Sequence, residues 1–230
     1  MFRASVLSLA AIGTIAGAAD AAAIFLEYAD PPGELSVVHT TAGPGQMTST
    51  LTVSTNVNLE IDLSAFGMGA TTFMNATINK TVSLGQVNEV APGVYLADAT
   101  EGFFEFLDSN NNLIVGGTYG LNGTSGAAFV LSQSGSLTTN ASMVGGILEY
   151  EVGAFLQGIL DANNQVLDLS AADASWTLTG ISPGTDVTDE GYFADFNSNG
   201  SFSGSIHTIP APATAAMLGL AGLAGSRRRR

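Results

Sequence analysis

Apolar and polar side chains alternate along much of the central part of the chain. The clearest run extends from Leu51 to Leu63, where the apolar residues fall on odd positions and Thr, Ser, Asn, Glu and Asp fall between them. Alternation with a period of two residues is typical of a β-strand that has one buried face and one face in water. The run therefore predicts a long strand with its odd positions in the core: Leu51, Val53, Val57, Leu59, Ile61 and Leu63.

Similar but shorter segments occur on both sides of this run. Turn-forming residues separate several of them, such as Asp30-Pro31-Pro32-Gly33 and Pro92-Gly93. A later segment alternates at Leu148, Tyr150, Val152 and Leu156, which predicts one strand through all four residues. The other expected strands are Ile24–Tyr28, Leu35–His39, Phe73–Ile78, Val82–Val87, Val94–Ala97 and Ser175–Gly180, the last with Trp176 and Leu178 on one face.

Helical periodicity is absent from the chain outside its two ends. Gly, Ser, Thr and Asn separate the expected strands at intervals of about 8–12 residues, which is typical of antiparallel all-β domains. We therefore expect an antiparallel β-sandwich or jelly-roll-like domain over residues 24–206, with a β-barrel as the alternative. The hydrophobic content of 46% and the charged content of 11% of the whole chain argue against disorder.

Three Asx-rich stretches are expected to form turns. Two resemble each other, Phe106–Leu113 and Ile159–Val166, and each predicts a hairpin. The third, Asp195–Gly200, matches the opening of an EF-hand calcium loop, but Ile206 occupies the twelfth position, where calcium needs a bidentate Glu. A hairpin turn between Tyr192–Phe196 and Ser201–Ile206 is the preferred interpretation, with a calcium loop as the alternative.

The N-terminal residues have the three parts of a secretory signal peptide. A short basic region, Met1-Phe2-Arg3, precedes the apolar run Val6–Ile15, and small residues follow with A-x-A spacing. We expect residues 1–23 to form a signal helix that is removed by cleavage between Ala21 and Ala23.

The C-terminal residues 207–230 also have three parts. Pro210-Ala211-Pro212 precedes an apolar run, Ala213–Gly225, and four arginines, Arg227 to Arg230, close the chain. The run has about 13 residues, whereas a stable helical span needs about 20. Arginines beside an apolar segment stay on the cytoplasmic side, so the rest of the chain is expected outside the cytoplasm.

This order of motif, short membrane helix and basic end resembles the PEP-CTERM sorting signal of Gram-negative bacteria, with Ala211 at the position of the Glu in the family's motif. The resemblance implies processing by a membrane protease, the exosortase, and an association with extracellular polysaccharide. It implies a transient anchor in the inner membrane, then a place at the cell surface or in the medium. An ordinary tail anchor, or a disordered tail with a basic end, is the alternative.

Charge and cysteine content limit the possible functions of the central domain. Five of the six basic residues lie in the terminal segments, so Lys80 is the only base left against 19 acids, a net charge of −18 without the signal and the tail. Nucleic acid is excluded as a partner because phosphate binding requires Lys and Arg. The chain has no cysteine, which excludes a thiol nucleophile and cysteine metal sites, and nothing predicts a metal or another cofactor.

Candidate catalytic residues are few. The two histidines, His39 and His207, belong to no catalytic or zinc-binding motif. Two pairs of acids, Glu101 with Glu105 and Glu149 with Glu151, could serve a glycosidase, although acids on the wet face of a strand are common. Trp176 suits either a core or a sugar-stacking platform. We therefore expect a non-enzymatic surface or matrix protein, with a carbohydrate- or calcium-dependent binding module and a carboxylate-based hydrolase as the alternatives.

Overall fold

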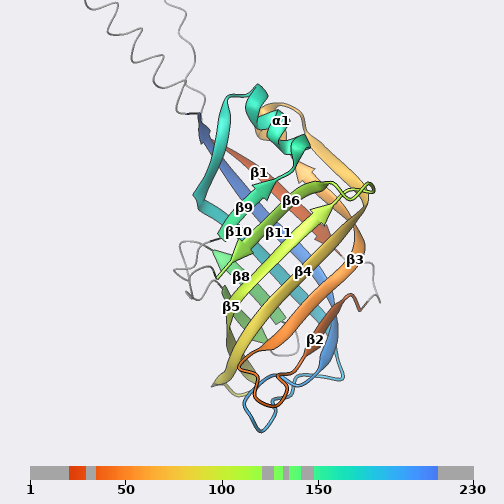
Figure 1. Cartoon of the computed structure of the whole chain (residues 1–230), viewed down its shortest axis with the longest axis vertical. Coiled ribbons are helices and arrows are strands. Elements are labelled where there is room, and N and C mark those ends of the chain that lie inside the picture. The colour runs from red at the N-terminus through yellow and green to blue at the C-terminus, as the bar shows by residue number, and fades with distance from the viewer. Residues whose placement is uncertain (1–20, 30–34, 121–126, 132–134, 141–147, 212–230) are drawn as a thin grey trace, which may run out of the picture.

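The computed structural model describes residues 21–29, 35–120, 127–131, 135–140 and 148–211. These residues form eleven β-strands, one α-helix and one short 3-10 helix (Figure 1). The expected all-β antiparallel class is confirmed. The elements in chain order are β1 (Ala22–Ala29), β2 (Val37–Thr40), β3 (Ser49–Asp62), η1 (Ser64–Phe66), β4 (Ala70–Ala91), β5 (Val94–Leu107), β6 (Leu113–Tyr119), β7 (Ala127–Leu131), β8 (Gly135–Asn140), β9 (Leu148–Val152), α1 (Ala154–Ala162), β10 (Gln165–Ser182) and β11 (Phe196–Pro210).

The strands pair into one sheet that closes on itself. Pairing runs from β3 through β4, β5, β7, β8, β10 and β11, and every one of these pairs is antiparallel. Both β1 and β2 pair with β11 on one side and with β3 on the other. The two strands therefore close the sheet between β11 and β3, each at a different level along these strands. β6 and β9 extend from β5 as a side branch. The pairing therefore favours the closed arrangement over a sandwich with separate sheets.

The alternation predicted for Leu51–Leu63 is confirmed in β3. All six of its odd-numbered apolar residues are buried, and the polar residues between them are exposed or half-buried. Residues on alternate positions of neighbouring strands share a face, so these residues line the interior together with the inward side chains of β1 and β4. The predicted turn at Pro92-Gly93 is also confirmed, and Gly93 has the positive φ of 70° that glycine tolerates best.

Several strand predictions were too short. Phe73–Ile78 and Val82–Val87 belong to one strand, β4, because Lys80 keeps the inward register instead of ending it. Similarly, the segment Val94–Ala97 is only the start of β5.

The hairpin expected across Asp195–Gly200 is wrong. Residues 196–200 lie inside β11, which continues without a turn and pairs with β2 and β10 over this stretch. Phe196, Ser198 and Gly200 are buried by their neighbours on both sides, so pairing prevails over the turn preference of Asn and Gly. β11 also continues past Ile206, the expected end of the domain, to Pro210.

The strand expected through Leu156 is wrong as well. β9 ends at Val152, and the next residues form α1, which buries Leu156, Ile159 and Leu160. The second Asx-rich stretch therefore ends a helix, with Asn163 at the C-cap and Asn164 at a positive φ of 52°. The first stretch is a hairpin between β5 and β6, as predicted, where Asp108 accepts hydrogen bonds from the backbone N–H groups of Asn110 and Asn112.

Aromatic rings fill the centre of the closed sheet. Trp176 from β10 lies 4.9 Å from Phe104 of β5 and 4.8 Å from Phe202 of β11, measured between ring centroids. The core alternative for Trp176 is therefore confirmed, since its side chain is only 1% exposed.

Lys80 projects into this aromatic core. Its Nζ lies 3.4 Å from the centroid of the Trp176 ring and has no hydrogen-bond partner among the described residues. Burial lowers the pKa of the Lys80 amine well below its ordinary value of 10.5. The only base of the domain is thus inside it, and the surface of the described residues carries acids without lysine or arginine.

Candidate functional site

A shallow groove on the outer face of β5, β6 and β9 gathers three of the four glutamates that the sequence singled out. Its volume is about 480 Å³. The register places Glu105 opposite Gly116, and Gly116 opposite Glu151, so the three residues form one row across the strands. Thr118 and Glu149 pair in the next row. We name this set of outward-facing residues the acidic groove: Phe103, Glu105, Gly116, Thr118, Glu149 and Glu151.

Glycine on the middle strand creates the groove. Gly116 has no side chain beyond a hydrogen atom and lies between Glu105 and Glu151, so any larger residue there would make the groove shallower. A Cβ atom at Gly116 would lie 3.1 Å from the carbonyl oxygen of Phe104, so the strand also packs closely here. On the inner face, a Cβ atom at Gly117 would lie 2.6 Å from the Phe104 ring. The paired glycines thus hold β6 close to β5 while leaving a depression outside.

The walls of the groove combine acceptor groups with an aromatic surface. Glu105 is half-buried, and its Oε1 accepts a hydrogen bond of 3.0 Å from Nδ2 of Asn79. Asn79 in turn accepts a hydrogen bond from Ser54, so this carboxylate is held in place. Glu149 and Glu151 are exposed, and 42% of Phe103 is exposed beside them. Such a surface can accept hydrogen bonds from hydroxyl groups and can pack against an apolar face of the same ligand.

The grouping differs from the two pairs expected from the sequence. Glu105 lies with Glu149 and Glu151. Glu101 does not line the groove, and its Oε1 accepts a hydrogen bond of 3.5 Å from Oγ of Ser83. The sequence gives the outward direction of each glutamate through strand alternation. It does not reveal that β6 lies between β5 and β9, so Gly116 and Phe103 were missed. The expected non-enzymatic function and its alternative, a carboxylate-based hydrolase, both stay predictions.

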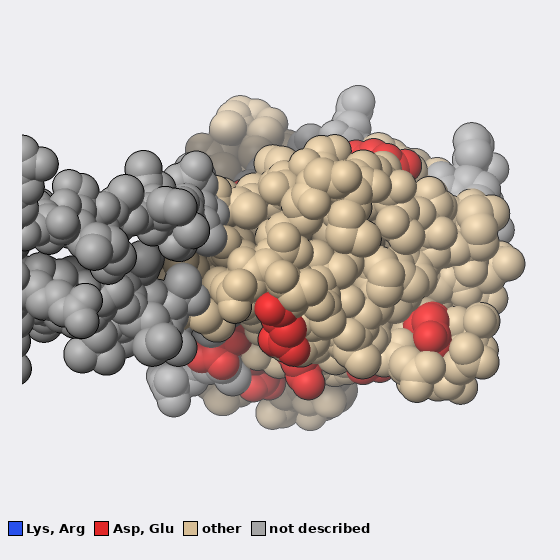
Figure 2. Space-filling model, turned by 90° about the horizontal axis from the view of Figure 1, so that it is seen from above, with Lys and Arg blue, Asp and Glu red and all other residues tan. Residues whose placement is uncertain are grey.

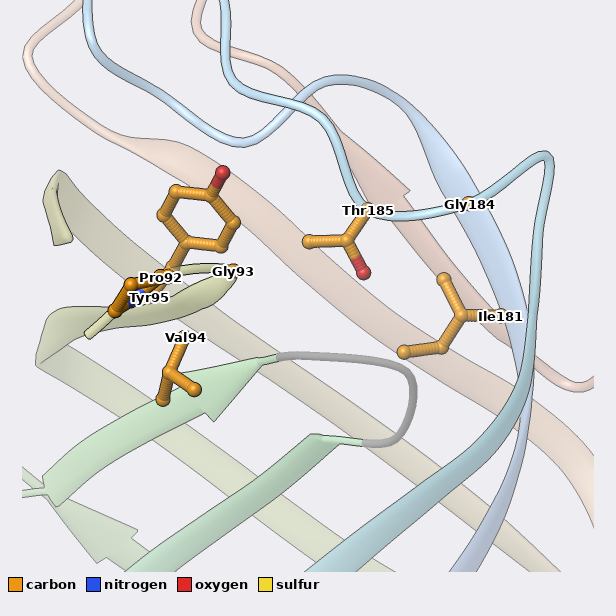
Figure 3. A pocket seen from close by; sticks show the side chains of 7 residues that line it. All are labelled: Pro92, Gly93, Val94, Tyr95, Ile181, Gly184 and Thr185. Atoms are coloured by element: carbon orange, nitrogen blue, oxygen red, sulfur yellow. The ribbon is translucent and has the colours of Figure 1, made fainter. Parts of the chain in front are cut away.

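A larger cavity of about 610 Å³ lies at the opposite end of the sheet from α1. It is formed by the turn between β4 and β5, by Ile181 near the end of β10, and by Gly184 and Thr185 after β10. Figure 3 shows the side chains of Tyr95, Thr185 and Ile181 around the opening. The described lining residues include no Asp, Glu, Lys, Arg or His, so they offer apolar packing and the hydroxyl groups of Tyr95 and Thr185.

The two histidines lie in different surroundings and do not form a pair. His39 of β2 is buried, stacks on Phe196 at 4.7 Å, and its Nδ1 lies 3.0 Å from the carbonyl oxygen of Ala194. Burial lowers the pKa of His39, although the contact with Ala194 opposes this shift. His207 lies near the end of β11, where its Nε2 is 3.3 Å from Oγ of Ser205. His39 therefore connects β2 to the segment before β11 and has a structural role.

The stretch that resembled a calcium loop does not have the shape of one. Asn197 and Asn199 belong to β11, and Oδ1 of Asp195 accepts a 2.7 Å hydrogen bond from the backbone N–H of Thr41. A calcium loop must curl its oxygens around one point, which an extended strand does not allow. Within the described ranges, no group of three or more His, Cys, Asp or Glu residues is placed to hold a metal ion.

The described residues include only part of the expected terminal signals. Ala21 precedes β1, and Ala23 lies within it opposite His207. Pro210 is the last residue of β11 and pairs with Gln165, and the backbone N–H of the following Ala211 donates to the carbonyl oxygen of Asn164. Pro212, the apolar run Ala213–Gly225, Arg227, Arg228, Arg229 and Arg230 lie outside the described residues, as do residues 1–20 and the turn expected at residues 30–33. In the part of the chain that is described, no helix has the length and apolar character needed to cross a membrane.

The fold and this surface define an acidic all-β domain with a closed antiparallel sheet. Comparisons of the chain with protein-family models, with curated proteins and with solved structures give no match.

Proposed function

We propose that this chain is an exported protein of the cell surface or extracellular matrix, which is held at the inner membrane by its C-terminal segment until that segment is removed. A signal peptide at one end and a sorting signal at the other support this proposal, together with the resemblance of residues 210–230 to the PEP-CTERM signal. The domain itself acts as a non-catalytic module, and its partners are an exosortase-type protease and extracellular polysaccharide.

The structural observation that best supports the proposal is the pairing of the first and last strands. Ala22 lies opposite Thr208, and Ala23 lies opposite His207, so both chain ends leave the same end of the domain side by side (Figure 1). The signal peptide and the C-terminal segment must both reach the same bilayer from one rigid domain. Because the chain leaves the domain at neighbouring points at its two ends, no additional linker is needed. β1 also begins at Ala22, so cleavage after Ala21 would remove the signal peptide and leave the strand complete.

The C-terminal motif provides the first test. Because Pro210 pairs with Gln165 of β10 and Ala211 is bonded to Asn164, we expect the mature chain to end at or after Pro212, beyond these contacts. Replacing both Pro210 and Pro212 with Ala should leave an uncleaved form in the membrane fraction. Replacing all four terminal arginines with Gln should disturb the stop signal and the processing. Peptide mapping of the C-terminus in cell and medium fractions measures each result.

A matched control is Pro92→Ala, in the turn at the far end of the domain, which should be processed like the original chain. Recovery of an intact Arg230 on most of the exported protein would contradict the sorting proposal and would leave an ordinary tail anchor.

The acidic groove favours a second function, binding of a matrix polysaccharide. Carboxylates suit the hydroxyl groups of a neutral sugar chain, and the exposed ring of Phe103 suits the apolar face of a sugar ring. A polyanionic glycan is disfavoured, because the domain has a net charge of −18 and no exposed base among the described residues.

We therefore expect neutral oligosaccharides to bind the full chain and Phe103→Ala to weaken binding by about tenfold, equivalent to 1.4 kcal/mol. Glu151→Gln should also weaken it, since an amide accepts hydrogen bonds less strongly than a carboxylate. Isothermal titration against a panel of neutral oligosaccharides measures the affinity. Phe25→Ala is the control, because Phe25 is an exposed phenylalanine on β1, away from the groove. Equal affinities for the Phe103 and Phe25 variants would exclude the groove as the binding site.

A further inference from the structure

We propose that the end of the domain that carries α1 rests against the lipid surface while the chain is anchored. We name this surface the α1 end and define it by α1, the segment Leu63–Ala70 between β3 and β4, the start of β4 as far as Met74, and the adjoining ends of β1, β10 and β11. The inference rests on the proposed anchoring, and it adds a second contact between the protein and the membrane.

The first observation is the distribution of exposed apolar side chains. Among the described residues, eleven large apolar side chains are exposed, and six of them lie at the α1 end. These include Met74, which is 64% exposed, and Phe25, which is 56% exposed. The remaining four at this end are Met68, Phe155, Val166 and Ile209.

These residues belong to connected elements. Phe155 of α1 contacts Phe73, the neighbour of Met74, with 5.3 Å between ring centroids. Val166 and Ile209 are directly opposite in the pairing of β10 with β11. Phe25 is opposite Asp62, the last residue of β3, and β1 also contacts η1. The exposed side chains therefore surround one end of the sheet.

The second observation is the length of chain that connects this end to the apolar run. Ala211 is bonded to Asn164, and the run begins at Ala213, so only Pro212 lies between them. Two extended residue steps cover about 7 Å at most. If the run enters the bilayer, the α1 end lies within about one or two residue lengths of the lipid interface, and its exposed side chains face lipid rather than bulk water.

The charge of this end agrees with an apolar contact. Figure 2 views the molecule from this side and shows a broad area without acidic residues, separate groups of acidic residues, and no Lys or Arg among the described residues in view. Three acids at this end are bonded within their own segments, Asp62 with Ser64, Asp108 with Asn112 and Asp161 with Gln157. The exposed Glu27 and Glu60 lie opposite each other two residues further along β1 and β3 and border the apolar surface. The opposite end carries Glu89, Asp186, Asp189, Glu190 and Asp195, which oppose a lipid contact.

Anchoring makes even a weak contact effective, since a tethered group experiences a high local concentration of its partner. Binding through apolar side chains without lysine or arginine should not require anionic lipids. We therefore commit to a neutral lipid surface as the occupant of the α1 end.

The experiment uses the full chain in phosphatidylcholine vesicles. The chain has no cysteine, so a single introduced cysteine can carry an environment-sensitive fluorophore. The probe positions are Phe155→Cys and Met74→Cys at the α1 end, with Met47→Cys and Val90→Cys as matched exposed positions at the far end. Vesicles with spin-labelled lipids should quench the first two probes by about twofold or more and leave the other two unchanged.

Each other outcome counts against the inference. If the chain sediments with vesicles but no probe is quenched, the domain stands clear of lipid and the inference is wrong while anchoring holds. If the chain does not sediment with vesicles, the proposed anchoring fails first. The fluorescence of the probe at Phe155→Cys could instead shift to the blue as the protein concentration rises, without quenching by the spin-labelled lipids. That result would assign the surface to a second copy of the chain.

Discussion

Replacing Lys80 with methionine is expected to raise the free energy of unfolding by about 1–4 kcal/mol. The Lys80 amine is buried among Trp176, Phe104 and other aromatic rings without a hydrogen-bond partner among the described residues. Methionine has a similar length and an unbranched side chain, so it can fill the same space without a polar atom. Chemical denaturation of the original chain and the variant at pH 7 measures the difference.

Two opposing energies determine how easily the buried Lys80 amine carries a charge. A cation over a desolvated tryptophan ring gains about 2 kcal/mol. Transfer of an unpaired ammonium group from water to the interior costs several kcal/mol even after relaxation. Desolvation therefore exceeds the attraction to Trp176, and it lowers the pKa of Lys80 well below 10.5.

The lowered pKa gives the stability a defined dependence on pH. Between the folded-state pKa of Lys80 and 10.5, the unfolded chain binds a proton that the folded chain does not. The contribution of Lys80 to stability therefore rises with pH through this window, by about 1.4 kcal/mol per pH unit, and levels off above 10.5. The difference in stability between Lys80→Met and the original chain should shrink as the pH rises, and subtraction removes the effects of other titrating groups.

Leu84→Met is the matched control for this prediction. Leu84 is buried on the same face of β4, and an exchange of similar volume should cost less than about 1.5 kcal/mol with no change in pH dependence. A Lys80→Met variant that is less stable than the original chain at every pH would show that the amine makes a favourable interaction inside the core.

The second large effect is expected from Gly153→Ala, with a loss of about 3 kcal/mol or more. Gly153 precedes α1 and its N–H donates to the carbonyl oxygen of Ile114 at 2.9 Å. A Cβ atom there would overlap the carbonyl oxygen of Leu113, which belongs to the backbone of β6 and cannot rotate away. The strand or the helix must move, and either movement opens the packing of Leu156 below α1.

Gly158→Ala in the same helix provides the opposite result. No atom lies within 4 Å of a Cβ built at this position, and glycine is about 1 kcal/mol less favourable than alanine inside a helix. We expect this variant to be more stable by up to that amount. Thermal unfolding of both variants measures the contrast, and equal melting temperatures would show that Gly153 is not constrained by β6.

Local alternation predicted the strands well because each strand keeps one face in the core. The pattern in β3 needs no knowledge of its neighbours. Lys80 could have been found in the same way, since Ala76, Ile78, Val82 and Leu84 share its phase, and that phase is buried. Charged side chains usually face water, so Lys80 is unusual among the buried positions of β4. Burial disfavours its charged form and thereby lowers its pKa.

Pairing between distant segments explains the features that local patterns did not predict. Asn197, Asn199 and Gly200 have turn preferences, but β2 and β10 hold them in a strand from both sides. Leu156 fits the phase of β9, yet Gly153 interrupts the strand and the following residues cover the sheet as α1. The acidic groove depends on β6 lying between β5 and β9, which no single segment of sequence encodes.

The pairing of β1 with β11 has a consequence for the order of folding. Oγ of Thr208 donates to the carbonyl oxygen of Ala22 across 186 residues, and among the described strands β1 pairs only with β3 and β11. Closing so long a loop carries a large entropic cost, and sheets made of such distant contacts form slowly. The ring therefore stays open until β11 has been synthesised, and in the export that we propose the chain would cross the membrane before its sheet has closed. Under that proposal, closure follows once residue 210 has crossed, and the slow step of folding would take place at the outer face of the membrane.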